Sequence, residues 1–139
     1  MNPVLVVDCS VTLAWCFDDE ARSDCDHIQE RLASEIAIVP ILWKLEVANV
    51  LALAERKGRV APERVAATFA RLSDLLIIED EDTSTHAWSS TIDLARKHKL
   101  TTYDAAYLEL AIRKQIPLAT LDVELQRAAA AATVPLILK

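Results

Sequence analysis

The chain has 139 residues, of which 53% are hydrophobic and only 5% aromatic, and its formal net charge is −6. This length is typical of one domain with a substantial core, which we place at residues 1–139, and the negative charge fits poorly with nucleic-acid binding through a broad basic face. The single glycine argues against a glycine-rich phosphate-binding loop, and no apolar run approaches the roughly 18 residues of a membrane span.

Short apolar runs alternate with helical patterns along the chain. The first run, VLVVD, is too short for a helix and ends on Asp8, and Ser10 is suited to cap the helix that follows. Pro40 and Gly58 mark the start and the end of a later helix. Strands separated by helices predict an α/β fold, a three-layer α/β/α sandwich around a central, mostly parallel sheet. We predict strands at residues 3–8, 36–39, 75–78, 117–120 and 134–138, and helices at residues 10–17, 27–34, 40–57, 62–72, 84–98, 103–114 and 122–131.

Two of the predicted strands deliver an acid to the same edge of the sheet. Asp8 ends the first strand, and Asp122 follows the strand at 117–120 by two residues. In a parallel sheet, binding sites lie in the crevice beyond the carboxyl ends of the strands. This shared position indicates that Asp8 is placed there for chemistry.

Two further acids lie on predicted helices. Glu46 lies in PILWKLEVANVL, where nearly all neighbours are apolar, and a buried carboxylate is costly unless it is paired or bound to a metal. The alternative is that Glu46 and Lys44 form a polar stripe facing solvent. Asp104 falls in the first turn of a helix that Thr101 or Thr102 can cap. The helix dipole favours an anion at that position, whether or not the acid has a further role.

Four carboxylates in one crevice cannot all remain ionised without compensating positive charge. Mg²⁺ and Mn²⁺ supply such charge through oxygen ligands and retained waters, and their common use is phosphoester cleavage. The histidines and cysteines are scattered, with no CxxC, and offer no competing ligand set: His27, His86 and His98, and Cys9, Cys16 and Cys25. An odd number of cysteines indicates reduced thiols in a cytoplasmic protein, and we expect no signal peptide.

Four segments, in this order, resemble those of PIN-domain ribonucleases, and specifically VapC-type toxins of type II toxin–antitoxin pairs. These segments are VVDCSVTLAWCFDDE, PILWKLEVANVLALAERKGRV, LTTYDAAYLELA and LATLD, and the resemblance covers essentially the whole chain. It implies an α/β/α sandwich and a Mg²⁺-dependent endoribonuclease, with Mn²⁺ able to substitute, that leaves 5′-phosphate and 3′-hydroxyl ends. It also implies a homodimer and a small antitoxin protein that blocks the acidic site.

The resemblance assigns roles to individual residues. The family's catalytic and metal-binding acids match four positions, Asp8, Glu46, Asp104 and Asp122. Ser10 and Thr120 match the small hydroxyl residues beside the first and last acids, where they would orient carboxylates or waters. Helix capping by Ser10 and the strand propensity of Thr120 are the alternative explanations for these two.

Basic and aromatic residues offer possible contacts to RNA. Two basic clusters are candidates for phosphate binding, namely Arg56, Lys57 and Arg59, and Arg96, Lys97 and Lys99. Each cluster is also explained by the preference of helix C-termini for cations. The tryptophans, Trp15, Trp43 and Trp88, can stack on a base, although such residues more often anchor a core or an interface. The acidic stretches DDEARSDCD and EDED are predicted to be solvated loops.

Three other functions compete with the ribonuclease. A catalytically silent PIN-fold module would bind RNA or protein without cutting, although all four acids are present. A haloacid-dehalogenase-type phosphatase needs a second aspartate where this chain has Ser10, and a receiver domain needs a lysine where LATLD provides an acid. An assay on small phosphoesters against one on RNA separates the enzyme classes, and a metal titration identifies the silent module.

Overall fold

The computed structural model describes residues 2–138, and its centre is a four-stranded sheet with the strand order β3–β2–β1–β4. All three strand pairings are parallel, and Val6 pairs with Ile38 on one side and with Leu118 on the other. The strands are β1 (Leu5–Val7), β2 (Ala37–Pro40), β3 (Ile77–Asp80) and β4 (Leu118–Ala119). The carboxyl end of β1 therefore lies between those of its two neighbours.

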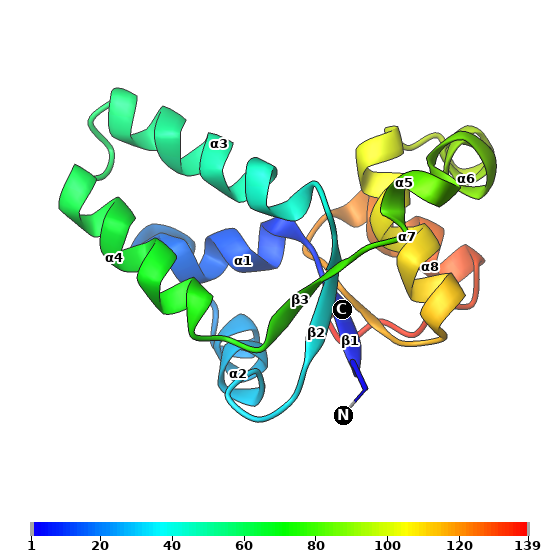
Figure 1. The fold of residues 1–139 in the computed structure, drawn as a ribbon, viewed down its shortest axis with the longest axis horizontal. Coiled ribbons are helices and arrows are strands. Elements are labelled where there is room, and N and C mark those ends of the chain that lie inside the picture. Colours follow the sequence, from blue (N-terminus) through cyan, green and yellow to red (C-terminus); the bar gives the residue numbers. More distant parts are fainter. Residues whose placement is uncertain (1, 139) are drawn as a thin grey trace.

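Helices cover the sheet on both sides, as the alternating pattern of strands and helices predicted (Figure 1). One group consists of α1 (Cys9–Cys16), α2 (Ser23–Arg31), α3 (Trp43–Arg56) and α4 (Pro62–Ser73). The other consists of α5 (Thr83–His86), α6 (Ile92–His98), α7 (Thr102–Lys114) and α8 (Val123–Ala131). A 3₁₀ turn at Asp18–Glu20 follows α1, and a π-helical turn at Ala87–Thr91 joins α5 to α6. These layers confirm the predicted α/β fold with a parallel sheet.

The core forms around the central strand. Leu5, Val6 and Val7 are completely buried, because β1 has a neighbour on each edge and helices on each face. Helix α7 packs on β1 and β2, and its residues from Ala105 to Ala111 are all buried. Within the described residues 2–138, no helix combines the length and apolar character needed to cross a membrane.

Several predicted element boundaries were wrong. Pro40 ends β2 instead of starting a helix, and α3 begins three residues later at Trp43. The helix predicted at 84–98 is divided by the π-helical turn.

Strand β3 lies two residues later than predicted, because the chain is still in the turn after α4 at Leu75, and of Leu76 only the carbonyl, which accepts from the amide of Ala37, bonds to β2. The predicted fifth strand at 134–138 is reduced to a single parallel bridge between Leu118 and Leu136. Helix α2 begins at Ser23, inside the stretch predicted to be a polar loop.

The acidic stretch EDED is not simply a solvated loop. Asp80 ends β3 and its side chain is only 3% exposed, because Arg113 of α7 pairs with it at 2.5 Å. Arg113 also pairs with Glu109, one turn earlier on α7, at 2.8 Å. This buried cluster fastens the end of β3 to α7.

Candidate functional site

Asp8 is held at the carboxyl end of β1 by three hydrogen bonds. Its Oδ1 accepts from the Ser10 hydroxyl at 2.6 Å and from the Val11 amide at 3.2 Å, and its Oδ2 accepts from the Thr120 hydroxyl at 2.5 Å. The bond from Val11 also makes Asp8 the N-cap of α1, so the prediction that Ser10 caps this helix was wrong, and Ser10 lies inside its first turn. Burial raises the pKa of Asp8 to about 6 in spite of these bonds, and the nearby charge of Asp104 raises it further. The ionised form of Asp8 therefore lacks a compensating positive charge.

The hydroxyls of Ser10 and Thr120 join the ends of β1 and β4. Besides donating to Asp8, Ser10 Oγ accepts from the amide of Leu121 at 2.9 Å, and Thr120 Oγ1 accepts from the amide of Asp122 at 3.0 Å. Each hydroxyl therefore uses its proton on the carboxylate and a lone pair on the turn after β4. This arrangement fixes Asp122 relative to Asp8.

Asp122 and Asp104 both lie at helix starts. Asp122 caps α8 by accepting from the amide of Leu125 at 3.0 Å, and Thr101 caps α7 by accepting from the amide of Asp104 at 3.1 Å. Burial raises the pKa of Asp104, and the charge of Asp122 adds to the increase. Thr101, one of the two caps that the sequence offered, is thus the N-cap, and Asp104 lies in the first turn as predicted, with its carboxylate not used for capping.

Glu46 lies in the first turn of α3 and faces α7. Burial raises the pKa of Glu46, and the charges of Asp104 and Asp8 raise it further, whereas a hydrogen bond from the hydroxyl of Tyr107 lowers it. That bond is 2.5 Å long. Lys44, the other member of the suggested polar stripe, pairs instead with Glu79 at 3.0 Å. Glu46 is therefore part of the acidic group and not of a solvent-facing stripe.

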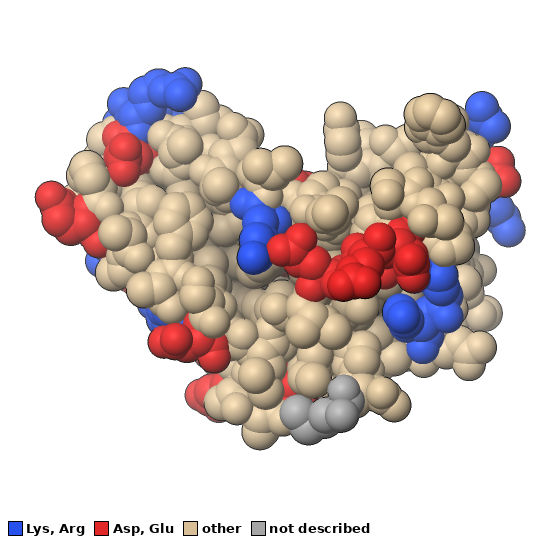
Figure 2. Space-filling view, in the orientation of Figure 1, with Lys and Arg blue, Asp and Glu red and all other residues tan. Residues whose placement is uncertain are grey.

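Asp104 is the electrostatic centre of the group. Its charge contributes to the raised pKa of both Asp8 and Glu46, and its own pKa is raised by Asp122. The structure thus brings together all four acids that the sequence singled out, from the end of β1, the starts of α3 and α7, and the turn before α8. The first turns of α3 and α7 flank the hollow that opens between the two helical lobes (Figures 1 and 2).

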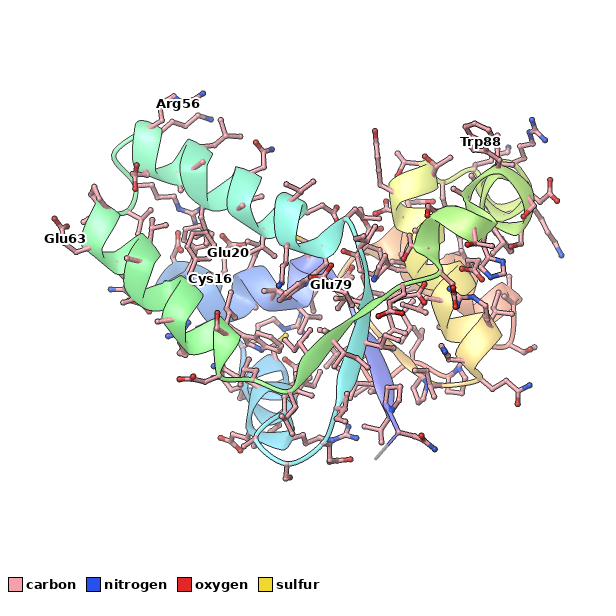
Figure 3. All side chains as sticks on the ribbon, viewed as in Figure 1. Cys16, Glu20, Arg56, Glu63, Glu79 and Trp88 are labelled. Carbon is pink, nitrogen blue, oxygen red and sulfur yellow. The ribbon has the colours of Figure 1, made fainter. Side chains whose placement is uncertain are left out.

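A buried tryptophan fixes the start of α3. Trp43 donates from Nε1 to the hydroxyl of Thr12 at 3.0 Å, and Thr12 donates to the backbone carbonyl of Asp8 at 3.0 Å. Trp15 has a similar structural role, since its Nε1 donates to the carbonyl of Cys25. Trp88 differs, because it is 94% exposed and lies on the lobe formed by α5 to α8 (Figure 3). Of the three tryptophans, Trp88 alone is available to a partner.

The donor chemistry of the four acids fits a hard divalent cation. Carboxylate oxygens are the ligands that Mg²⁺ and Mn²⁺ prefer, and Mg²⁺ usually retains several waters while one or two carboxylates hold it. Within residues 2–138, none of the four forms a salt bridge with a lysine, arginine or histidine. Over the same residues, no three acidic, histidine or cysteine side chains form a ready-made ligand set for one ion. Waters would therefore complete the coordination of a bound ion.

Cys9 lies inside the field of the acids without belonging to the donor set. Burial, followed by the charges of Glu46 and Asp8, raises the pKa of its thiol to about 12. The thiol of Cys9 is therefore protonated at neutral pH, whereas a thiol binds metals as the thiolate. The four acids themselves present oxygen donors only.

The basic candidates for RNA binding lie in different surroundings. Arg59 is already engaged, because it pairs with Asp19 and Glu20 and its guanidinium lies 3.9 Å from the centre of the Phe17 ring. Arg56 lies at the far end of α3, about 15 Å of helix beyond Glu46 (Figure 3). The second cluster is at the end of α6, where Arg96 approaches Asp93 at 3.7 Å, and Lys97 and Lys99 are exposed.

Tyr107 is the residue of the site that the sequence interpretation missed. It lies three residues after Asp104 on α7, a spacing that places both on one side of the helix, and it contacts Glu46 from a position 61 residues away in sequence. Its presence among apolar residues in YDAAYLELA made it look like part of the core. The three-residue spacing from Asp104 was the available signal.

Comparisons with known proteins agree with this architecture. Residues 5–131 match the model of the PIN domain. The crystal structure of PAE2754 from Pyrobaculum aerophilum superposes with a TM-score of 0.66 over 91% of this chain and 79% of that chain, at 24% sequence identity. That identity supports a shared fold alone. A search of the curated proteins found no match. Because the family model spans nearly the whole chain, the protein belongs to the PIN domain family.

Proposed function

We propose that this protein is a Mg²⁺- or Mn²⁺-dependent endoribonuclease that hydrolyses RNA phosphodiester bonds. The observation that carries the proposal is the convergence of Asp8, Glu46, Asp104 and Asp122, three of which have a raised pKa caused by burial and by one another's charges. Such a group is unfavourable unless a cation joins it. Nuclease activity is also typical of PIN domains, to which this chain belongs.

The four acidic side chains differ in how firmly hydrogen bonds hold them in place. Asp8 is fixed by Ser10, Val11 and Thr120, so we assign it as the central ligand together with Asp104. Glu46 and Asp122 complete the acidic ring, directly or through waters. These acids would hold a divalent cation, whose chemistry when bound would be to activate water and to stabilise charge on the phosphate oxygens. The contribution of the chain is to hold the carboxylates in place before the cation and the RNA arrive.

RNA must approach a chain of net charge −6. On the face shown in Figure 2, acidic side chains form a band across the middle, with a group of Lys and Arg against each end of it and further groups on the two lobes. Such a surface favours weak binding that depends strongly on salt. We propose that selectivity comes from RNA shape and from unpaired bases in loops.

We further propose that the enzyme is the toxin of a toxin–antitoxin pair and that it forms a homodimer. The support is the sequence resemblance to VapC-type toxins together with membership of the PIN domain family. Large apolar side chains next to two of the acids are exposed, with Leu45 at 75% and Val123 at 72%. Such exposure is compatible with protein partners that cover the edge of the site.

The testing experiment is cleavage of a pool of total small RNA and ribosomal RNA by the purified protein, shown to be free of an antitoxin. Reactions contain Mg²⁺, Mn²⁺ or a chelator, with Asp104→Asn as the matched variant, and the cut ends are mapped. Discrete metal-dependent cuts that leave 5′-phosphates and are absent with Asp104→Asn support the proposal. Folded protein that binds Mn²⁺ without cutting any RNA would overturn it in favour of a silent binding module.

A further inference from the structure

We propose that Tyr107 is a positioning residue of the candidate site, and that its hydroxyl holds the Glu46 carboxylate ready for a divalent cation. This inference rests on the proposed metal-dependent function. Tyr107 is 1% exposed, and its hydroxyl donates to Oε1 of Glu46 at 2.5 Å. The contact joins the first turn of α3 to α7, one turn after Asp104.

The Tyr107 hydroxyl acts as a hydrogen-bond donor to Glu46. A phenol has an ordinary pKa of about 10, so Tyr107 carries its proton at neutral pH and donates it in the hydrogen bond to Glu46. A protonated phenol beside a carboxylate is a donor. Because the bond occupies Oε1, Oε2 is left for another partner, and within residues 2–138 no other hydrogen bond reaches the Glu46 side chain.

Glu46 gains more from such a donor than an aspartate at the same place would. It has a longer side chain with more rotatable bonds, and ordering it on ion binding costs more conformational entropy. Asp8 has three hydrogen-bond donors, and Asp122 accepts from the amide of Leu125. Glu46 has Tyr107 alone. Preorganisation by Tyr107 removes part of the ordering cost before the ion binds.

The ring and the hydroxyl of Tyr107 have separable roles. The ring fills the core between α7 and its neighbours, as its near-complete burial shows. Tyr107→Phe keeps that packing and removes only the donor. Tyr103, on the same helix, is 65% exposed, so Tyr103→Phe is a matched control that removes a hydroxyl without touching Glu46.

The experiment measures Mn²⁺ affinity by calorimetry on the purified full chain, alongside the RNA-cleavage rate at saturating Mn²⁺. We expect Tyr107→Phe to weaken Mn²⁺ binding about tenfold, the usual effect of removing a group that orients a metal ligand, while Tyr103→Phe binds as the wild type does. In a Glu46→Gln background, Tyr107→Phe should have no further effect, since the carboxylate it positions is gone. A general loss of structure would instead weaken binding equally in both backgrounds.

The outcomes separate this inference from the proposed function. If the wild type binds Mn²⁺ and cuts RNA, and Tyr107→Phe has the same Mn²⁺ affinity, the positioning role is wrong and the function stands. If the wild type binds Mn²⁺ without cutting RNA, the affinities still decide the role of Tyr107. A wild type that binds no Mn²⁺ overturns both.

Discussion

The hydroxyl of Thr120 donates a 2.5 Å hydrogen bond to Oδ2 of Asp8, across 112 residues of sequence. The hydroxyl oxygen of Thr120 also accepts a hydrogen bond from the amide of Asp122, so one buried hydroxyl contacts two of the four acids. Thr120→Val preserves the shape of the side chain and removes both bonds. We expect a loss of about 1–3 kcal/mol in the free energy of unfolding and a large drop in RNA cleavage, measured by urea denaturation and by the cleavage assay.

Thr120→Ser is the matched control, because it keeps the hydroxyl and removes only a methyl group. It should retain most of the cleavage activity. If Thr120→Val and Thr120→Ser are equally active, the hydroxyl does not orient Asp8, and Thr120 serves only as a buried residue at the end of β4.

Removing the charge of Asp8 should stabilise the metal-free protein at neutral pH. Burial raises the pKa of Asp8 from 3.8 to about 6, so the folded state binds the proton more tightly than the unfolded chain does. Protonated Asp8 therefore stabilises the folded state by about 3 kcal/mol. This stabilisation is complete below pH 3.8 and is lost as pH rises through about 6. Asp8→Asn cannot ionise, so its stability relative to the wild type should increase by about that amount between roughly pH 4 and pH 7.

The measurement is thermal denaturation of both proteins across this pH range in a chelator. Addition of Mn²⁺ at neutral pH should then stabilise the wild type more than Asp8→Asn, because the variant lacks one of the four carboxylates that would hold the ion. A stability difference that does not vary with pH would show that Asp8 titrates normally in the folded protein.

The order of the elements could be predicted because the strands differ clearly from the helices in pattern. Short apolar runs such as VLVV have no helical periodicity, and the helices between them require parallel pairing. The position of β3 could not be predicted in the same way. LLII is equally apolar throughout. Only the tertiary contacts show that the amide of Leu76 donates to the carbonyl of Leu32 at the end of α2, whereas Ile77 and Ile78 pair with β2.

The site was predictable to the extent that strand ends determine it. Asp8 and Asp122 follow strands of one parallel sheet, which brings them to the same edge. Glu46 and Asp104 required the family pattern, because helix position alone explains an acid at each place equally well. The contact between Tyr107 and Glu46 joins residues 61 positions apart, and nothing in the local sequence predicts how α3 meets α7.

Arg113 should be among the most important polar residues for stability. It neutralises two nearly buried carboxylates, those of Asp80 and Glu109, which are 3% and 6% exposed. Arg113→Met keeps the aliphatic part of the side chain and leaves both acids without a partner, which should cost about 3–5 kcal/mol. Urea denaturation at neutral pH measures this loss.

Arg31→Met is the control for that variant, since Arg31 pairs with Glu35 at the same spacing on a more exposed surface and should contribute less than about 1 kcal/mol. Burial raises the pKa of Asp80, but hydrogen bonds led by that from Arg113 outweigh this effect and lower it overall. Its contribution is therefore present at neutral pH and lost as pH falls through the lowered pKa. Equal stability losses for Arg113→Met and Arg31→Met would show that the cluster does not fasten β3 to α7.

The basic residues should differ in their contribution to RNA binding. Arg59 is paired with Asp19 and Glu20, whereas Lys57 and Lys97 form no salt bridge within residues 2–138. A free lysine that contacts a phosphate releases counterions, and its loss reduces the slope of log Kd against log salt by about 0.7 for single-stranded RNA. We expect this reduction for Lys57→Gln or Lys97→Gln and none for Arg59→Gln. Fluorescence anisotropy with labelled RNA, in an Asp104→Asn background that prevents cleavage, measures the slopes. A reduction with Arg59→Gln alone would mean that RNA displaces the acidic partners of Arg59.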